Sequence, residues 1–335
     1  MIEIAADGRE WSDFVRGHPD AIPFHHPAWL LLLAECYQFR PSALVLPSSA
    51  GGIAAGLPVI EVASRFRPRR WVSLPFTDIC PPLGAGTEAI FAELERVRLE
   101  RGLGEIEVRS NLPGGSACSA PAAVTHTLRL DQDPDPVVRG FRASTRRNAR
   151  AAERHGVVIR LGESERDLVE TFYRLHVLTR RRFGLPVQPR RFFRLLWRRM
   201  VEPGLAFVLL AHHGSVPVAG AVFLCWNRTV TYKYGASDPL FWGLRPNDLL
   251  FSQAIRRACE DGYERFDFGR TELGNDSLRR FKLGWGSTES ELAYTIVGGP
   301  ERPVRNPPVV VRGLIRRAPT WVSRGLGELF YRRTA

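Results

Sequence analysis

The sequence predicts an α+β protein in which two halves share one order of elements. In the first half, a helical stretch at residues 87–101 ends at a glycine, and an alternating strand follows at 105–109. In the second half, a helix at 247–261 also ends at a glycine, and a strand follows at 265–268. Identity between the two stretches is slight, but the repeated order indicates two variants of one domain plan.

The second half contains further elements before that helix. Two helices are predicted at 164–182 and 188–200, the second with an apolar stripe suited to burial. Three apolar or alternating segments at 206–211, 216–226 and 229–234 are separated by short turns, which is typical of an antiparallel meander. Helices combined with such a meander favour the α+β class.

These elements predict a first domain at residues 1–135 and a second at 136–300, with the proline- and aspartate-rich segment 131–136 as the linker. In the tail at 301–335, apolar side chains alternate with arginines. Such a tail is either a basic amphipathic helix that contacts an anionic membrane or a terminal helix that packs on the protein. Its proline and glycines argue against one continuous helix.

The formal net charge of +12 is unevenly divided along the 335 residues. Residues 1–135 contain 12 Arg against 17 Asp and Glu, whereas residues 136–335 contain 35 Lys and Arg against 18 Asp and Glu. Two arginine clusters stand out, at 139–154 and 174–199. The basic second half predicts a phosphate-bearing polyanionic partner, although a charge run is more often a solvated face.

Composition argues against several classes of protein. A hydrophobic content of 44% and a charged content of 24% are typical of a globular chain. The five cysteines form no C-x-x-C pair and none lies at zinc-ligand spacing, so we expect no metal site. Without a signal-peptide pattern or an apolar run of membrane-spanning length, we expect a cytoplasmic location, with the tail as a candidate contact to the inner face of the membrane.

Lysine usage is the most unusual feature of the chain. It holds 45 arginines and only two lysines, Lys233 and Lys282. Because both residue types serve as solvated cations, the lysines that persist are candidates for positions that need a compact, flexible ammonium. Both lie among aromatic residues, but chance composition explains either one alone equally well.

Several ordered motifs resemble those of the Fem-type transferases and their relatives in the GNAT superfamily. The main ones are F-D-F-G-R-T at 266–271 and F-K-L-G-W-G at 281–286. Others are F-H-H-P-A-W at 24–29, L-P-F-T-D at 74–78 and S-T-R-R-N at 144–148. The resemblance covers roughly residues 20–297 and depends on motifs in a fixed order.

The resemblance implies a fold of two tandem GNAT-like domains, each with a mixed, mostly antiparallel sheet flanked by helices. It implies attack of an amine on an activated carbonyl to form an amide, with an aminoacyl-tRNA as donor and no tightly bound cofactor. The acceptor it implies is a peptidoglycan precursor or another cell-envelope amine held between the domains, or an amine of a natural-product pathway. The chain lacks a heptad run and therefore resembles the compact members without a coiled-coil arm.

The resemblance assigns the catalytic lysine to Lys282. An ammonium can stabilise the negative charge that develops on the carbonyl oxygen, and Phe281 would exclude water from it. The alternative for Lys282 is an ion pair with Asp267 or Glu289. Asp78 is the candidate to accept the amine's proton or to orient the amine, although an aspartate in a proline-rich loop is often a turn former.

Further residues are assigned to binding. Arg270 is a candidate for an acceptor or donor phosphate, with a structural pair to Asp267 as the alternative. The other expected substrate contacts are Phe281, Asn275, Lys233, Tyr234 and Trp29. The expected contacts to donor phosphates are Arg146, Arg147, Arg181 and Arg182.

The loop at 238–247 bears on the donor. GNAT enzymes hold the CoA pyrophosphate with a glycine-rich loop before a helix, but this loop has one glycine and places prolines where backbone N–H groups are needed. This favours a tRNA-borne donor over acyl-CoA. An acyl-CoA-dependent N-acyltransferase and a non-enzymatic, basic nucleic-acid-binding protein remain the alternatives.

Overall fold

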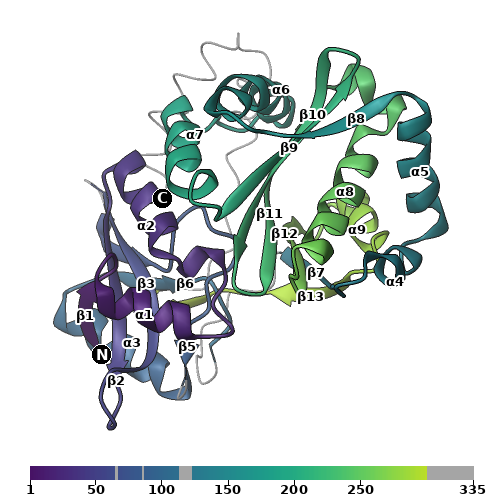
Figure 1. Cartoon of the computed structure of the whole chain (residues 1–335). Helices are drawn as coiled ribbons and strands as arrows, with labels where there is room; N and C mark the ends of the chain where they lie inside the picture. The colour runs from purple at the N-terminus through teal and green to yellow at the C-terminus, as the bar shows by residue number, and fades with distance from the viewer. Residues whose placement is uncertain (65–66, 85–86, 113–122, 300–335) are drawn as a thin grey trace.

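A computed structural model describes residues 1–64, 67–84, 87–112 and 123–299. In this part of the chain, two seven-stranded sheets are flanked by helices (Figure 1). This confirms the predicted α+β class with two mixed sheets. The tail at 301–335 lies outside the described residues, so the expectations for it stay predictions.

The first sheet is built from the N-terminal half, with one strand added from the far end of the chain. Its strand order is β1-β2-β3-β4-β6-β14, and β5 pairs with β3. All neighbours are antiparallel except β4 and β6. The strands are β1 (Ile2–Ala5), β2 (Arg40–Pro47), β3 (Ile53–Ser64), β4 (Arg67–Val72), β5 (Leu83–Gly84), β6 (Glu105–Val108) and β14 (Thr295–Val297). The helices of this half are α1 (Arg9–Gly17), α2 (Pro27–Tyr37) and α3 (Thr87–Glu100).

The second sheet has the order β13-β7-β12-β11-β10-β9-β8, with β11 and β12 parallel. Its strands are β7 (Ala123–Arg129), β8 (Val157–Leu161), β9 (Ala206–His213), β10 (Val216–Trp226), β11 (Thr229–Ser237), β12 (Arg265–Glu272) and β13 (Thr288–Leu292). The helices are α4 (Pro134–Arg139), α5 (Ala143–Arg154), α6 (Tyr173–Phe183), α7 (Arg190–Leu196), α8 (Pro246–Glu260) and α9 (Asp276–Leu283). The predicted meander is therefore confirmed as β9, β10 and β11.

The two helices predicted before the meander are present, but each includes a π-helical turn. Asp167–Phe172 precedes α6, and Trp197–Val201 follows α7. The apolar stripe expected on the second helix is buried, as Phe193, Leu196 and Met200 show.

The internal repeat is confirmed by the two strand orders. In each sheet, four consecutive antiparallel strands are followed by a helix, and the next strand then pairs parallel to the fourth. In the first half this connection runs from β4 through the short β5 and α3 to β6, and in the second half α8 makes it from β11 to β12.

The sheets do not divide the chain at residues 135 and 136, where the sequence placed the boundary. β7 lies before that point, yet it pairs with β12 and β13 of the second sheet. β14 lies near the end of the described chain, yet it pairs with β6 of the first sheet. The segment expected as a linker runs into α4, so each half completes its sheet with a strand from the other side of the boundary.

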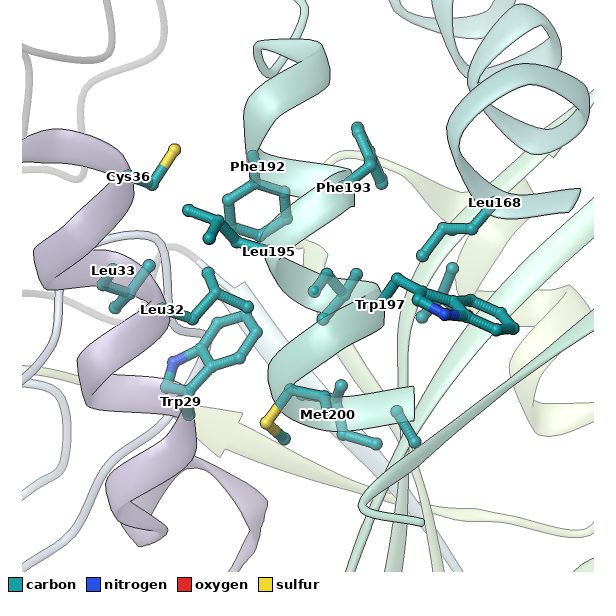
Figure 2. Close-up of a cluster of buried hydrophobic side chains, with 14 of the residues drawn as sticks. Trp29, Leu32, Leu33, Cys36, Leu168, Phe192, Phe193, Leu195, Trp197 and Met200 are labelled. Carbon is teal, nitrogen blue, oxygen red and sulfur yellow. The ribbon is translucent and has the colours of Figure 1, made fainter. Parts of the chain in front are cut away.

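A shared hydrophobic core also joins the halves (Figure 2). α2 packs against α7, and the ring centroids of Trp29 and Phe192 lie 6.2 Å apart in an edge-on arrangement. Leu33 and Met200 are fully buried in the same cluster. Burial of each such side chain stabilises the folded protein by about 1.5–3 kcal/mol relative to its exposure to water. The shared packing therefore favours one rigid arrangement of the two halves.

None of the described helices combines the length and the apolar character that a bilayer crossing requires.

Candidate functional site

The candidate site lies where the parallel strands of the second sheet separate. β11 and β12 pair only from Thr229 with Arg265 to Thr231 with Asp267. Beyond this point β12 is irregular, because its register with β7 shifts between Asp267 and Arg270. The side chains that follow the last pair are therefore free to contact the first half of the chain.

A tightly held loop of the first half reaches this point. Leu74 and Phe76 adopt left-handed backbone conformations, with φ of 65° and 60°. Trp29 Nε1 donates to Thr77 Oγ1 at 3.1 Å, and the Tyr294 hydroxyl donates to the Asp78 carbonyl at 2.6 Å. These contacts fix Asp78 on a rigid segment, which is the arrangement that a functional carboxylate requires.

Trp29 is placed differently from the sequence expectation. Its side chain is fully buried, so it has no surface for a substrate contact. The indole supports the loop of Asp78 from behind instead. The aromatic motif at 24–29 pointed to this region, but only the packing of α2 reveals that Trp29 faces inward.

Lys233 extends from β11 into the same region. Its Nζ donates to the Phe76 carbonyl at 2.8 Å and lies 3.5 Å from Asp78 Oδ2. The rings of Phe24 and Tyr234 lie 5.0 and 5.6 Å from that nitrogen. Burial lowers the pKa of Lys233, and Asp78 opposes the shift. Lys233 therefore positions the loop and its carboxylate across the two halves.

Lys282 projects from α9 toward the irregular part of β12. Its Nζ donates to the carbonyls of Gly269 at 2.8 Å and Arg270 at 3.2 Å, and the residue is only 2% exposed. Burial lowers its pKa to about 8, while Asp78 and Asp267 favour the charged form. The ammonium has three hydrogens and two backbone acceptors here, so one N–H remains for another acceptor.

Neither alternative ion pair of Lys282 is formed in the described structure. Glu289 instead pairs with Arg279, with N–O distances of 2.6 and 2.9 Å. Asp267 accepts a hydrogen bond from the backbone N–H of Gly269 at 2.8 Å. The ammonium of Lys282 is thus held by carbonyl oxygens and not neutralised by a contacting carboxylate.

Gly269 allows the two halves to approach each other. Its φ is +68°, and a Cβ there would lie 3.1 Å from Asp78 Oδ2 and 3.2 Å from the Tyr232 carbonyl oxygen. Such a conformation favours glycine, and the space behind it is already filled. The carboxylate of Asp78 therefore packs directly over the backbone that binds Lys282.

Asp267 completes the cluster and was not selected as a site residue from the sequence. Burial raises its pKa to about 6, and the negative charge of Asp78 acts in the same direction. The sequence feature that could have indicated Asp267 is its position between two phenylalanines in an alternating strand. Phe266 and Phe268 are buried in the core, so the intervening side chain points to the opposite face, toward Asp78.

His126 is a second residue that the sequence did not reveal. It is fully buried on β7, and its Nε2 lies 2.9 Å from Glu289 Oε2. Burial lowers the pKa of His126, and the charge of Lys282 lowers it further. The positive charge of Lys282 therefore makes protonation of His126 less favourable.

Four charged groups thus meet at one place: Asp78, Lys233, Asp267 and Lys282. Two carboxylates can bind and deprotonate an amine, and a buried ammonium can stabilise a developing oxyanion. Within the described residues, no group of His, Cys, Asp and Glu is arranged to hold a metal ion.

Of the other expected substrate residues, three have capping or packing contacts within the fold and one is partly exposed. Asn275 caps α9, since its Oδ1 accepts from the Leu278 N–H at 3.2 Å. Phe281 packs against Trp285 in the core of the second half, and Tyr234 packs in the core shared by the halves. Arg270, in contrast, is partly exposed and follows Gly269 directly.

The four arginines expected to bind donor phosphates differ in their contacts. Arg146 donates to the carbonyls of Arg139 and Phe141 and so holds the turn before α5. The Arg182 guanidinium lies 4.3 Å from the centre of the Trp242 ring. Arg147 is exposed on α5 and Arg181 is partly exposed on α6, so these two remain available to a phosphate.

The loop before α8 differs from an anion-binding loop. Asp248 lies in the first turn of α8, and its Oδ1 accepts from the side-chain amide of Asn148 at 3.2 Å. A carboxylate here already interacts with the positive end of the helix dipole, where a pyrophosphate would need to bind. The residues present therefore fit an acyl-CoA pyrophosphate poorly.

Comparison with known proteins concerns the fold. Residues 139–283 match the family described as "Acetyltransferase (GNAT) domain". This match covers less than half of the chain and lies within its second half. No curated protein matches the sequence.

Solved structures extend the GNAT similarity to almost the whole chain. FemX is 16% identical, with a TM-score of 0.67 over 89% of this chain and 98% of its own. L-PGS from Bacillus licheniformis is 14% identical, with a TM-score of 0.55 over 95% and 100%. A tandem GNAT protein from the clavulanic acid biosynthesis pathway is 13% identical, with a TM-score of 0.50 over 90% and 99%.

These comparisons confirm the predicted fold of two tandem GNAT-like units, a fold similar to that of FemX. The family match supports acyl transfer as the general activity.

Proposed function

We propose that this GNAT protein forms an amide bond by transferring an aminoacyl group from an aminoacyl-tRNA to an amine of a cell-envelope precursor or a natural product. The observation that carries the proposal is the meeting of Asp78 and Lys233 with Asp267 and Lys282 across the two halves of the chain. Lys233 lies 3.5 Å from Asp78, and Lys282 is held within the irregular part of β12.

In this proposal the acceptor enters as an ammonium and is attracted by the two carboxylates. Asp78 orients it, and Asp267, whose pKa of about 6 lies near neutrality, accepts its proton. The freed amine attacks the carbonyl carbon of the aminoacyl ester. The carbonyl oxygen becomes an oxyanion, and the remaining N–H of Lys282 stabilises it by about 3 kcal/mol. When the C–O bond to the ribose breaks, the leaving oxygen takes the proton that the attacking nitrogen gives up, and the amide remains.

The charge distribution supports a polyanionic donor. Residues 136–335 carry 35 Lys and Arg against 18 Asp and Glu. Arg147 and Arg150 on α5 are exposed, as is Arg142 directly before the helix. The backbone N–H of Arg142 donates to the Gly284 carbonyl at 2.9 Å, just after α9. A basic helix next to the helix of Lys282 suits a phosphate backbone that delivers its acyl end there.

An acyl-CoA donor is the second candidate. The name of the matching family favours it, whereas Asp248 in the first turn of α8 argues against it. With either donor, the acyl carrier is a substrate that leaves after the reaction. The proposal therefore includes no tightly bound cofactor. A purely nucleic-acid-binding role is less consistent with a buried lysine among carboxylates.

The deciding experiment incubates the purified protein with charged tRNAs and, separately, with acetyl-CoA, in the presence of candidate amines. We expect consumption of aminoacyl-tRNA and loss of product after ribonuclease treatment of the donor. Consumption of acetyl-CoA with ribonuclease-resistant product would replace the tRNA proposal with the acyl-CoA one. If neither donor is consumed and Lys282→Ala retains nucleic-acid binding and biological function, the protein is not an enzyme of this kind.

We also propose that the tail at residues 301–335 contacts the anionic inner face of the membrane. Its arginines and apolar residues suit such a surface. Sedimentation with anionic vesicles, compared between the full chain and a chain ending at residue 299, tests this directly. Equal sedimentation of the two would reject the membrane contact.

A further inference from the structure

The cations near the proposed site differ in whether a carboxylate neutralises them. Lys233 lies 3.5 Å from Asp78, and Arg109 lies 3.1 Å from Glu107. Arg270 is different, because its Nε is buried and none of the described residues accepts a hydrogen bond from it. None of the described carboxylates forms an ion pair with it either, including Asp267, the partner considered from the sequence. A buried guanidinium nitrogen without an acceptor is costly, so its partner should come from outside the chain.

The position of Arg270 places that missing partner beside the amine site. The Arg270 carbonyl oxygen accepts a hydrogen bond from Lys282 Nζ at 3.2 Å. Its backbone neighbour Gly269 would bring a Cβ to within 3.1 Å of Asp78 Oδ2. The Arg270 charge also acts on Tyr294, whose hydroxyl donates to the Asp78 carbonyl. Arg270 is partly exposed, so a ligand can reach the guanidinium.

We propose that Arg270 binds an acidic group, a carboxylate or a phosphate, which the acceptor carries near its reacting amine. This inference rests on the proposed function, since it takes Asp78 and Asp267 as the groups that bind the amine. The acceptor class is therefore an amine with a nearby acid, such as an amino acid, a peptide terminus or an aminophosphate, and not a simple alkylamine.

Two opposite charges at the site would orient the acceptor. The ammonium end is attracted by the carboxylates of Asp78 and Asp267, and the acidic end by the planar guanidinium of Arg270, which can donate two parallel hydrogen bonds. With both ends held, the amine nitrogen has one direction of approach. A single charged contact would leave the acceptor free to rotate.

The test measures equilibrium binding of amines without any donor. Two matched pairs serve as probes: lysine with cadaverine, and phosphoethanolamine with ethanolamine. We expect the acid-bearing member of at least one pair to bind about tenfold or more tightly to the wild type than its acid-free partner. The pair that shows the difference identifies the acid as a carboxylate or a phosphate.

Variants then assign the preference to Arg270. Arg270→Gln should abolish it, Arg270→Lys should retain part of it, and Arg160→Gln is the matched control, because it removes an exposed arginine of the same half. A preference that persists in Arg270→Gln, or no preference in the wild type, would overturn the inference. Because no donor is present, an Arg270-dependent preference would stand even if neither aminoacyl-tRNA nor acetyl-CoA proved to be a donor.

Discussion

The carboxylate of Asp78 lies 3.5 Å from the ammonium of Lys233, although Asp78 lies in a loop between two strands of the first sheet and Lys233 lies on β11 of the second. The same ammonium donates to the carbonyl of Phe76 in the loop of Asp78. The first half of the chain thus supplies a carboxylate to a site whose other charged groups lie on β11, β12 and α9. Neither half alone contains the whole constellation.

Replacement of Lys282 by alanine should lower kcat by at least tenfold, because the oxyanion would lose its nearest cation. The measurement is steady-state transfer with the donor identified above. Circular dichroism and the unfolding midpoint must show that the variant is folded, since Lys282 also satisfies two carbonyl oxygens. A folded variant with unchanged kcat would remove Lys282 from the mechanism.

Replacement of Gly269 by alanine should lower kcat and displace Asp78. The new Cβ would lie 3.1 Å from Asp78 Oδ2 and would have to adopt a φ of +68°. Gly262→Ala is the matched control, because Gly262 also has a positive φ, of +81°, but nothing lies within 4 Å of its Cβ position. Both variants should lose about 1 kcal/mol of stability from backbone strain. Only the first should lose activity, and equal kcat values would contradict the close packing of Asp78 over Gly269.

The pH dependence of kcat/KM should be bell-shaped. Asp267 must be ionised to accept a proton, so activity should rise as the pH increases through its pKa of about 6. Lys282 must be protonated to stabilise the oxyanion, so activity should fall as the pH increases through its pKa of about 8. Asp267→Asn should remove the acidic limb of the profile and leave the alkaline limb. An unchanged acidic limb would assign the proton acceptor to another group.

Replacement of Phe192 by alanine should destabilise the whole protein by about 3–5 kcal/mol, because it opens a cavity in the core shared by the two halves. Urea unfolding should show one transition at a lower midpoint, since the cluster contains residues from α2 as well as α7. Leu240→Ala, at an 88% exposed position, is the control and should change stability by less than about 0.5 kcal/mol. Two separate transitions in the Phe192 variant would show that the halves unfold independently.

Much of the local structure was predictable from the sequence, because helices and strands follow from residue periodicity and from glycines at their ends. Lys282 and Asp78 were also selected from motifs, and the structure brings both to the same cluster. The sequence did not indicate Asp267 as a site residue, because its role depends on the tertiary contact between β12 and the first half of the chain. Trp29 was assigned to substrate because an aromatic residue suits binding as well as packing. Only the tertiary arrangement distinguishes these roles.

The pairing of β7 and β14 could not be predicted for a similar reason. Their sequences identify them as strands, but a strand's partner is decided by contacts between residues far apart in the chain. A boundary placed by proline content therefore separated β7 from the sheet to which it belongs.

The exchanged strands also impose an order on folding during synthesis. When the first half leaves the ribosome, β6 has no neighbour on one side until residues 295–297 emerge. In the same way, β7 has no partner strand until β12 and β13 have been made. Unpaired strand edges are sites of aggregation. The nascent chain therefore has to keep two open edges from associating with other chains until residue 297 has been made, because neither sheet can take its final form while its partner strand is missing.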